Sequence, residues 1–373
     1  MTASGLELAL GGASTPGLTA REMGAEGRAA WDAFVAGHPL GHYMQSYEWG
    51  EIRAASGWTP IRVAVLVGDE IRACAQVLEK KLVLGHRCVH YAPRGPIVDY
   101  HDARLLADTV NALRAVGRRR GATMLRTDPA VGEEDAAARE ALDALGFRHS
   151  ERGTYWNAPR HVFRLDLSPD EDALFRSFRQ TTRNEIRQAA RKGVVIENSG
   201  TPGDLAEFHQ LMMVLGSRKG FPVRAYAHYR KLYDELLPRG LGKLFVARHD
   251  GTLIGGAFMA TMGDASWWLH GATSSEHRKL MPSKALAWAM ITWSKSVGRR
   301  WFDFLGSRLP GVADFKRGFR PTEASFIGCY DLPLRPTTYA LWRAAESRGV
   351  PAAVAVYRAV MPRLGFLRRG AST

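Results

Sequence analysis

A cation lies between two phenylalanines in the stretch DFKRGFR, residues 314–320. Lys316 follows Phe315 directly, and Phe319 comes three residues later, after a glycine, Gly318. Apolar rings lower the local dielectric constant, so a cation beside them interacts more strongly with negative charge. Lys316 is therefore our first candidate for stabilising negative charge in a reaction. Gly318 and Phe319 predict a tight turn into a following strand.

Five arginines recur at helical spacing in residues 168–193. This segment predicts one helix, with Ser168 as its N-cap and Gly193 at its C-terminal stop. Its apolar side would consist of Leu174, Phe178, Ile186 and Ala189. The arginines, in steps of three, four, four and four residues, are Arg176, Arg179, Arg183, Arg187 and Arg191. A solvated face usually mixes charge signs, whereas here only Asp172 can reach an arginine, so the stripe favours contact with nucleic acid or another polyphosphate.

Other kinds of chemistry find little support in the sequence. The three cysteines form no CxxC motif and no Cys/His cluster at metal spacing, so we expect neither disulfides nor a metal site. No Ser-His-Asp or Cys-His arrangement is legible, so we expect no covalent intermediate.

The chain carries 51 Lys and Arg against 37 Asp and Glu, a net charge of +14. This excess favours a polyanionic partner such as nucleic acid, anionic lipid or a nucleotide-linked substrate.

The N-terminal sequence lacks the basic start and apolar core of a signal peptide, and residues 1–20 predict a loose tail. No apolar run approaches the roughly 18–20 residues that span a bilayer. We therefore expect a protein of the reducing cytoplasm.

The elements that must position these residues occur twice, at an offset of 181 positions. Residues 63–77 and 244–260 both alternate apolar and polar residues around a Gly/Asp turn, which predicts strand, turn, strand. Residues 106–128 and 285–307 both predict an amphipathic helix with a basic, glycine-containing end and then a strand. Two elements at one offset indicate duplication. The predicted α/β order resembles the acyltransferase fold of the N-acetyltransferase (GNAT) type, present twice.

We place the first GNAT-like domain at residues 21–160 and the second at 161–331. Residues 332–373 predict a basic amphipathic helix that packs back on the first domain. The alternative, that this helix rests on an anionic membrane surface, stays open.

Neither copy carries the loop with which ordinary members of this fold hold the pyrophosphate of CoA. That loop offers backbone N–H groups from closely spaced glycines at the start of a helix. The second copy has Leu280, Met281 and Pro282 there, and proline has no N–H group. The first copy has a single glycine, Gly95, in residues 91–106. The sequence therefore predicts that acetyl-CoA is not the donor.

Six motifs in order resemble the Fem family of peptidoglycan-bridge aminoacyltransferases, from about residue 31 to residue 334. They are WDAFVAGHPLGHYMQSYEWGEIRAASGW, TTRNEIRQAARKGV, RKGFPVRAYAHYRKLYDEL, HGATSSEHRKLMPSKALAW, WFDFLG and FKRGFRPTEASFIGCYDLPL. The resemblance implies two tandem GNAT-like domains. Some relatives insert a coiled-coil arm in the second domain, but no sustained heptad appears in this chain.

The resemblance also implies an activity. The family moves an amino acid from aminoacyl-tRNA to the side-chain amine of the third stem residue of a peptidoglycan precursor, or to an amino acid already added there. Aminoacyl-tRNA is then a co-substrate, and no cofactor and no metal are needed. The implied acceptor is UDP-MurNAc-pentapeptide or lipid II, with contact to the inner face of the membrane as a further expectation. The delivered residue would be small, such as Gly, Ala or Ser.

Four residues are implied to carry out the chemistry. Lys316, with Phe315 beside it, would face the developing oxyanion or the ester end of the tRNA. His270, where relatives often have tyrosine, would line the acceptor pocket or relay the amine proton. Asp303 would orient the acceptor ammonium or merely cap a turn. His228 is not one of these four residues, but it too stands where relatives tend to have a tyrosine.

Five residues are implied to hold the acceptor. Arg224 with Tyr229 would grip the phosphates or the muramyl portion, because the guanidinium fork suits a diphosphate. Arg53 would make a second phosphate contact. Gln45 and Trp49 belong to the Gln-Ser-x-x-Trp core of the first motif.

Three other functions remain open from the sequence. One is an acyl-CoA-dependent N-acyltransferase, and another is tRNA-dependent aminoacyl transfer to an acceptor outside peptidoglycan. The third is a non-catalytic RNA-binding protein, which would keep the arginines but tolerate loss of Lys316.

Overall fold

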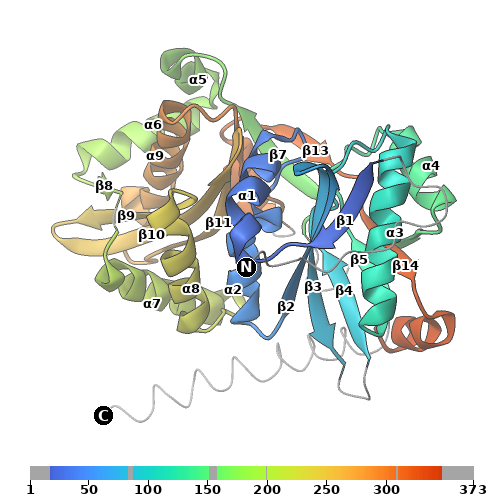
Figure 1. Ribbon diagram of the computed structural model, residues 1–373. Coiled ribbons are helices and arrows are strands. Elements are labelled where there is room, and N and C mark those ends of the chain that lie inside the picture. Colours follow the sequence, from blue (N-terminus) through green and yellow to red (C-terminus); the bar gives the residue numbers. More distant parts are fainter. Residues whose placement is uncertain (1–16, 83–86, 151–157, 199, 308–309, 347–373) are drawn as a thin grey trace, which may run out of the picture. The chain divides into compact units, whose positions relative to one another are not determined.

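The computed structural model describes residues 17–82, 87–150, 158–198, 200–307 and 310–346. The chain divides into two compact units (Figure 1). The first consists of the chain up to Arg160 together with residues from Ser325 to 346, and the second is His161–Ala324. Most of the predicted loose tail lies outside the described residues, and the prediction is wrong for its end, because residues from Leu18 onward form a strand.

The first unit is built on one sheet with strand order β1-β2-β3-β4-β5-β14-β6. Its strands are β1 (Leu18–Glu22), β2 (Thr59–Val67), β3 (Glu70–Lys81), β4 (Cys88–Ala92), β5 (Ala122–Thr127), β6 (Arg148–Ser150) and β14 (Cys329–Pro333). Its helices are η1 (Ala25–Gly27), α1 (Arg28–Gly37), η2 (Tyr43–Gln45), α2 (Tyr47–Ala54), α3 (Ala103–Arg119), α4 (Ala136–Ala144) and a helix at 336–346.

The second unit has the sheet order β13-β7-β12-β11-β10-β9-β8. Its strands are β7 (His161–Asp166), β8 (Val195–Glu197), β9 (Gly242–His249), β10 (Thr252–Met262), β11 (Ala265–Thr273), β12 (Trp301–Asp303) and β13 (Thr322–Ser325). Its helices are α5 (Glu171–Ser177), α6 (Gln180–Arg191), α7 (Pro202–Lys219), α8 (Tyr226–Leu236), η3 (Leu237–Arg239), η4 (Arg278–Leu280), α9 (Pro282–Ser296) and α10 (Pro310–Arg317).

The two units repeat one plan, which confirms the predicted tandem GNAT-like fold. In the first, the β2–β3 hairpin precedes a parallel pair, β4 and β5, joined by α3. In the second, the β9–β10 hairpin precedes the parallel pair β11 and β12, joined by α9. A parallel pair needs a crossover connection, and the amphipathic helix supplies it. The described part of the second unit contains no coiled-coil arm.

The chain returns to the first unit earlier than predicted. We placed residues up to 331 in the second domain, but β14 lies between β5 and β6 in the first sheet. A buried ion pair holds it there, because the Arg126 guanidinium lies 2.6 Å from Asp331 and 2.6 Å from Glu346. In the helix at 336–346, Tyr339 packs against Val89. The rest of the predicted C-terminal helix lies outside the described residues.

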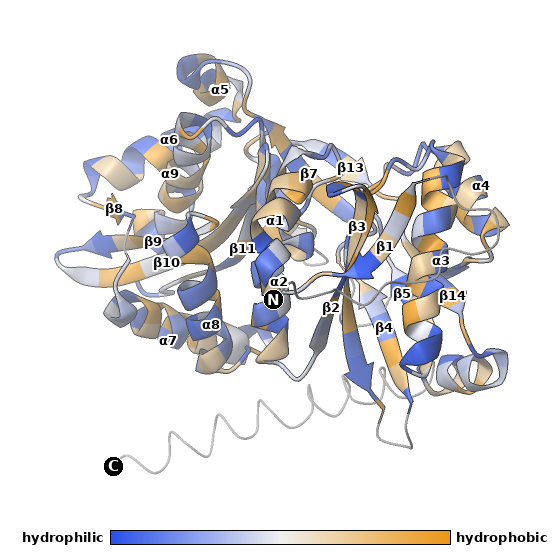
Figure 2. Ribbon diagram, in the orientation of Figure 1, coloured by the Kyte–Doolittle hydropathy of each residue, from blue (hydrophilic) through white to orange (hydrophobic). Residues whose placement is uncertain are grey.

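Each unit has its own core. In the first, α3 buries Leu106, Val110 and Leu113 at helical spacing against the sheet. Figure 2 shows that this helix carries both hydrophobic and hydrophilic residues. In the second, α9 buries Leu286 and Met290 in the same way. None of the helices in the described residues is long and apolar enough to span a bilayer.

The predicted helix at 168–193 is two helices. The expected apolar side is confirmed, since all four of its residues lie in the core of the second unit. However, α5 ends before Phe178, and α6 begins after Arg179, with extended backbone at both of these residues. The N-cap of α5 is Asp170, whose side chain accepts a hydrogen bond from Ala173 N, and not Ser168. The break occurs because the Arg179 N–H bonds the Gly318 carbonyl at 3.0 Å, a long-range contact that helical periodicity cannot reveal.

Candidate functional site

A cavity of about 420 Å³ lies within the second unit. It is lined by residues 268–273 of β11, residues 304–306 after β12, and parts of α7, α9 and α10. The sheet opens here, because β11 pairs with β12 only from Ala265 to Trp267 and then continues to Thr273 without that partner. The lining is mostly apolar, with a few polar groups, as is usual for a small-molecule site.

Lys316 lines this cavity from the last turn of α10. Its ammonium donates to the carbonyls of Leu305 and Gly306, both at 3.0 Å, and the side chain is only 7% exposed. Burial lowers the pKa of Lys316 to about 8, and the carboxylate of Asp303 opposes this shift. The group is therefore still mostly a cation at neutral pH. The expected turn at Gly318 does lead to β13, but α10 was not predicted.

Three phenylalanines lie close to Lys316, but the rings of Phe315 and Phe319 contact the ammonium of Lys284, at 4.3 and 4.8 Å. Phe315 lines the cavity beside Lys316, and its ring packs edge-on against Trp268 at 5.8 Å. Phe319 is fully buried behind Phe315, at 5.6 Å between ring centroids. Phe163 lies 5.7 Å from the Lys316 nitrogen. Lys316 is therefore buried beside an aromatic ring, which strengthens the field of its charge, but that ring is Phe163 and not the expected pair Phe315 and Phe319.

His270 lines the same cavity from β11. Burial and the positive charge of Arg224 together lower the pKa of His270 to about 4. The imidazole is therefore neutral at pH 7 and a weak base, which favours the expected lining role over proton relay. The Trp268 indole N–H caps the carbonyl of His270 at 2.8 Å. Gly271 allows this, because a Cβ there would lie 2.7 Å from the indole nitrogen.

Asp303 does not line the cavity. It is 4% exposed, and its carboxylate accepts a hydrogen bond of 2.6 Å from the backbone N–H of Leu305. Leu305 has a positive φ of 58° in this turn. Of the two roles considered for Asp303, capping this turn is the one that the geometry favours.

Arg224 and Tyr229 differ sharply in exposure. Arg224 is exposed in the segment before α8, where its carbonyl accepts a hydrogen bond from His209. Tyr229 is 1% exposed and packs against the ring of His270 at 5.0 Å. Burial raises the pKa of Tyr229 to about 12. Tyr229 therefore packs against His270, and the prediction that it grips a phosphate is wrong. Arg224, in contrast, is exposed and accessible to a phosphate. His228, also buried, lies in the same ring cluster.

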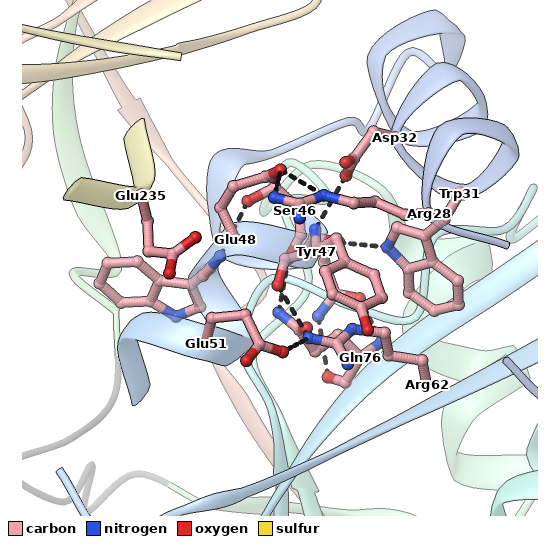
Figure 3. A network of polar contacts seen from close by, with 12 residues as sticks. Arg28, Trp31, Asp32, Ser46, Tyr47, Glu48, Glu51, Arg62, Gln76 and Glu235 are labelled. Carbon is pink, nitrogen blue, oxygen red and sulfur yellow. Dashed lines mark hydrogen bonds and ion pairs between the residues drawn. The ribbon is translucent and has the colours of Figure 1, made fainter. Parts of the chain in front are cut away.

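Gln45 has a structural role in the first unit, and its prediction as a substrate contact is wrong. It is completely buried, and its amide bonds the carbonyl of Pro93 at 2.7 Å and the N–H of Gln76 at 2.7 Å. Figure 3 shows the surrounding network, in which Arg62 bonds both the Tyr47 carbonyl and Glu51 at 2.8 Å. These bonds anchor the start of α2.

Trp49 and Arg53 lie on α2, which this network holds. Trp49 is half-buried and packs edge-on against Tyr43 at 5.2 Å. Arg53 is 8% exposed, and its guanidinium lies 6.0 Å from the ring of Trp49 and 5.3 Å from that of Trp58. Stacking of this kind fixes the direction of a guanidinium. The role of Arg53 as a phosphate contact stays a prediction.

The five arginines lie on two helices instead of one stripe. Arg176 is on α5 and Arg179 is the N-cap of α6, and the α6 arginines are Arg183, Arg187 and Arg191. All are exposed except Arg183, which is half-buried. Among the described residues, none of the five forms a salt bridge with a carboxylate. Two are held in place by other contacts, because Arg183 donates to the carbonyl of Arg176 at 2.9 Å and Arg187 lies 5.1 Å from the ring of Phe175.

The start of α9 offers few free backbone N–H groups to a pyrophosphate. Pro282 is its first residue, and Met281 before it has a positive φ of 57°. The backbone N–H of Lys284 is used by the carbonyl of Met281 at 3.1 Å. In the first unit, the carboxylate of Asp102 caps the start of α3 by accepting from Leu105 at 2.9 Å. A carboxylate there repels a phosphate, so both helix starts agree with the missing CoA loop.

One group of described side chains has its ligand atoms within 4.8 Å of one another: Glu79, Cys88 and His90. Arg120 already pairs with Glu79 at 2.9 Å, and His90 lies 3.2 Å from the same carboxylate. Burial, helped by the charge of Glu79, raises the pKa of Cys88 to about 12, so the thiol keeps its proton. A metal needs the thiolate and a free carboxylate. We interpret this group as a structural ion pair of the first unit.

Two features of the site were missed from the sequence. Trp268 closes one side of the cavity, and nothing in the sequence distinguishes it from a core tryptophan. Lys284, near the start of α9, is 9% exposed and reaches the carbonyl of Phe315 at 3.2 Å. A lysine in the first turn of a helix normally predicts an exposed side chain, so the sequence held no signal for its burial.

Two curated proteins with similar sequences are lipid II:glycine glycyltransferases. The lipid II:glycine glycyltransferase of Staphylococcus saprophyticus is 26% identical over 384 aligned residues, which cover 83% of this chain and 92% of that protein. The lipid II:glycine glycyltransferase of Staphylococcus haemolyticus is 25% identical, with 88% of this chain and 96% of that protein covered.

Solved structures share the fold. The crystal structure of FemX matches with a TM-score of 0.81 at 24% identity and covers 86% of this chain and 99% of that one. A tandem GNAT protein from the clavulanic acid biosynthesis pathway matches with a TM-score of 0.52 at 14% identity, with 86% and 99% covered. The sequence model of the FemAB family matches residues 27–248 and 241–347. Because this match extends over well more than half of the chain, the protein belongs to the FemAB family.

Proposed function

We propose that this protein transfers an amino acid from aminoacyl-tRNA to the side-chain amine of the third stem residue of a peptidoglycan precursor. Its family and its glycyltransferase relatives make it an aminoacyltransferase of peptidoglycan bridge formation. The observation that carries the finer proposal is the buried ammonium of Lys316 at the wall of an apolar cavity. The donor and the site of attachment are the proposed parts.

The reaction is aminolysis of an ester. The acceptor amine loses a proton and attacks the ester carbonyl, an amide bond forms, and the ribose oxygen leaves with a proton. Negative charge develops on the carbonyl oxygen between these steps. The ammonium of Lys316 has three N–H donors, and its two bonds among the described residues use two of them. The third can stabilise the oxyanion, in surroundings where water does not screen the charge.

Three observations support tRNA as the donor. The exposed arginines of α5 and α6 form no salt bridges with described residues, and the net charge of the chain is +14. Both helix starts lack a pyrophosphate cradle, which argues against CoA. An ester is already activated, so orientation and charge stabilisation suffice. We therefore propose aminoacyl-tRNA as co-substrate, with no metal and no further cofactor.

The names of the relatives favour a lipid-linked acceptor, lipid II, over UDP-MurNAc-pentapeptide. Its diphosphate would meet Arg224, which is exposed and close enough to His270 to lower the pKa of that residue. For the first unit, Arg53 stays a separate candidate for a phosphate contact. Because charged tRNA is a cytoplasmic donor and the proposed acceptor is lipid-linked, we propose that the enzyme acts in the cytoplasm at the inner face of the membrane.

A transfer assay with two donors and two acceptors tests this proposal. One donor is a mixture of charged tRNAs, and the other is acetyl-CoA. Each donor is tested with lipid II and with UDP-MurNAc-pentapeptide as the acceptor. We expect transfer from charged tRNA to lipid II. Efficient acetyl transfer from acetyl-CoA, with no transfer from any charged tRNA to either precursor, would refute the proposal in favour of an N-acyltransferase.

A further inference from the structure

Lys284 is a buried cation that the proposed reaction does not use. Its ammonium bonds the carbonyl of Phe315 at 3.2 Å and the hydroxyl of Thr182 at 3.4 Å. It also lies 4.3 Å from the ring of Phe315 and 4.8 Å from that of Phe319. The nearest carboxylate is Glu185, at 3.8 Å. A lysine of α9 thus contacts both α6, through Thr182 and Glu185, and the end of α10.

Burial of the Lys284 ammonium costs free energy, because the cation loses its contact with water. The groups around it must compensate for this loss. Burial lowers the pKa of Lys284 to about 8, and the charge of Glu185 opposes the shift. Buried lysines are rare unless they are paired. Here a carbonyl, a hydroxyl and two aromatic faces stabilise the ammonium at the point where α10 ends.

The start of α6 and the end of α10 are joined at the same point. The backbone N–H of Arg179, the N-cap of α6, bonds the carbonyl of Gly318 at 3.0 Å. A Cβ at Gly318 would lie 2.4 Å from the Thr182 hydroxyl and 2.9 Å from the Lys284 nitrogen. The close approach therefore needs glycine, and Lys284 fills the space that this glycine leaves.

We infer that Lys284 is a positioning residue that couples the α6 arginines to Lys316. It fixes the end of α10, which carries Phe315 and Lys316 to the cavity, against the start of the helix that presents the arginines. A tRNA held by these arginines would then have its ester kept at a set distance from Lys316. This inference rests on the proposed function, and it adds how donor binding and the cavity are linked.

The burial of Lys284 among α6, α9 and α10 leads to a specific expectation for Lys284→Met. Methionine keeps the apolar stem but removes the bonds to Phe315 and Thr182. We expect the single-turnover rate at saturating charged tRNA to fall by up to about 100-fold, because small misplacements of catalytic groups have effects of that size. The Kd for tRNA should change less than about twofold, since the α6 arginines remain. Lys284→Arg, which keeps a cation, should recover part of the rate.

Hydrogen exchange gives a readout that does not depend on transfer. In the wild-type protein, binding of uncharged tRNA should slow amide exchange in residues 315–319 by roughly fivefold or more. In Lys284→Met this protection should be lost while tRNA still binds. Thr182→Val is a milder change at the same contact, and it replaces Lys284→Met in this experiment if that variant does not fold. We expect Thr182→Val to weaken the protection.

The outcomes are distinct. Equal protection of residues 315–319 in wild type and Lys284→Met, or an unchanged rate, would overturn the coupling. Protection without any amino-acid transfer by the wild type would refute the proposed function and leave the coupling supported. Failure of the wild type to bind tRNA would overturn both.

Discussion

Replacement of Lys316 by methionine removes one charge from the cavity and little volume. The ammonium donates to two carbonyls at 3.0 Å, which fixes its place before any substrate binds. At an effective dielectric constant near 20, two unit charges about 4 Å apart interact by about 4 kcal/mol. An oxyanion that carries most of a charge would lose a comparable amount. This agrees with the 10²- to 10³-fold loss, about 2.7–4 kcal/mol, that removal of one preorganised donor causes.

The assay is a single-turnover measurement of amino-acid transfer from charged tRNA to lipid II. Arg317→Met is the matched control, because Arg317 is adjacent, has the same charge and pairs with Glu323 outside the cavity. We expect the control to retain nearly full rate. Methionine at 316 also leaves two carbonyls without their donor, so thermal unfolding of both variants must be compared. A folded Lys316→Met protein with near wild-type turnover would refute the assigned role.

Four further results are expected. Because the pKa values of Lys316 and Lys284 are both lowered to about 8, their charges are present below that pH and lost above it. The transfer rate should therefore fall above about pH 8, and the double variant Lys316→Arg/Lys284→Arg should move this fall to higher pH. An unchanged alkaline limb would contradict that. Replacement of the three α6 arginines by glutamine should reduce the slope of log K for tRNA against log salt by roughly 2–3, whereas the salt-bridged Arg230→Gln should leave it unchanged. Arg126→Met leaves Asp331 and a second carboxylate buried without their main cation, so the free energy of unfolding in urea should drop by about 3 kcal/mol or more; a drop below about 1 kcal/mol would be inconsistent with the buried pair. Gly271→Ala forces the indole of Trp268 away, and the transfer rate should fall by up to about 100-fold with tRNA binding intact.

Much of the fold was predictable because it is written in local patterns. The hairpin turns at Asp69 and Asp250, and the helix-to-strand segments that follow them, all lie where the repeat placed them. The early return of the chain at residue 325 was not predictable. It depends on Arg126, whose two carboxylate partners are 205 and 220 residues away in sequence, and no local pattern encodes such a pair.

The site was predictable where one chemical property decided the role. Lys316, Phe315 and His270 line one cavity. The first two were chosen for their chemical type and spacing, whereas His270 was chosen from the family resemblance. Gln45 and Tyr229 were misassigned because a polar residue in a motif can equally bond the protein's own backbone or pack in the core. Only the three-dimensional structure distinguishes these cases.

The break between α5 and α6 shows the same limit. Periodicity continues across Phe178 and Arg179, and both sides of the break bury their apolar residues. The break itself follows from a backbone bond to Gly318, far along the chain. Lys284 was missed for a related reason, since its burial depends on the same contact between the start of α6 and the end of α10.

The most direct test of the central claim is the mass of the precursor after reaction. Lipid II should be incubated with the protein and charged tRNA, and the stem peptide then fragmented in a mass spectrometer. We predict the gain of one small amino acid on the side-chain amine of the third stem residue. Within the time in which the wild type completes one turnover, this gain should be reduced about 100-fold or more with Lys316→Met and retained with Arg317→Met. An unmodified stem peptide with wild-type protein and charged tRNA, or a gain that persists without charged tRNA, would contradict the account.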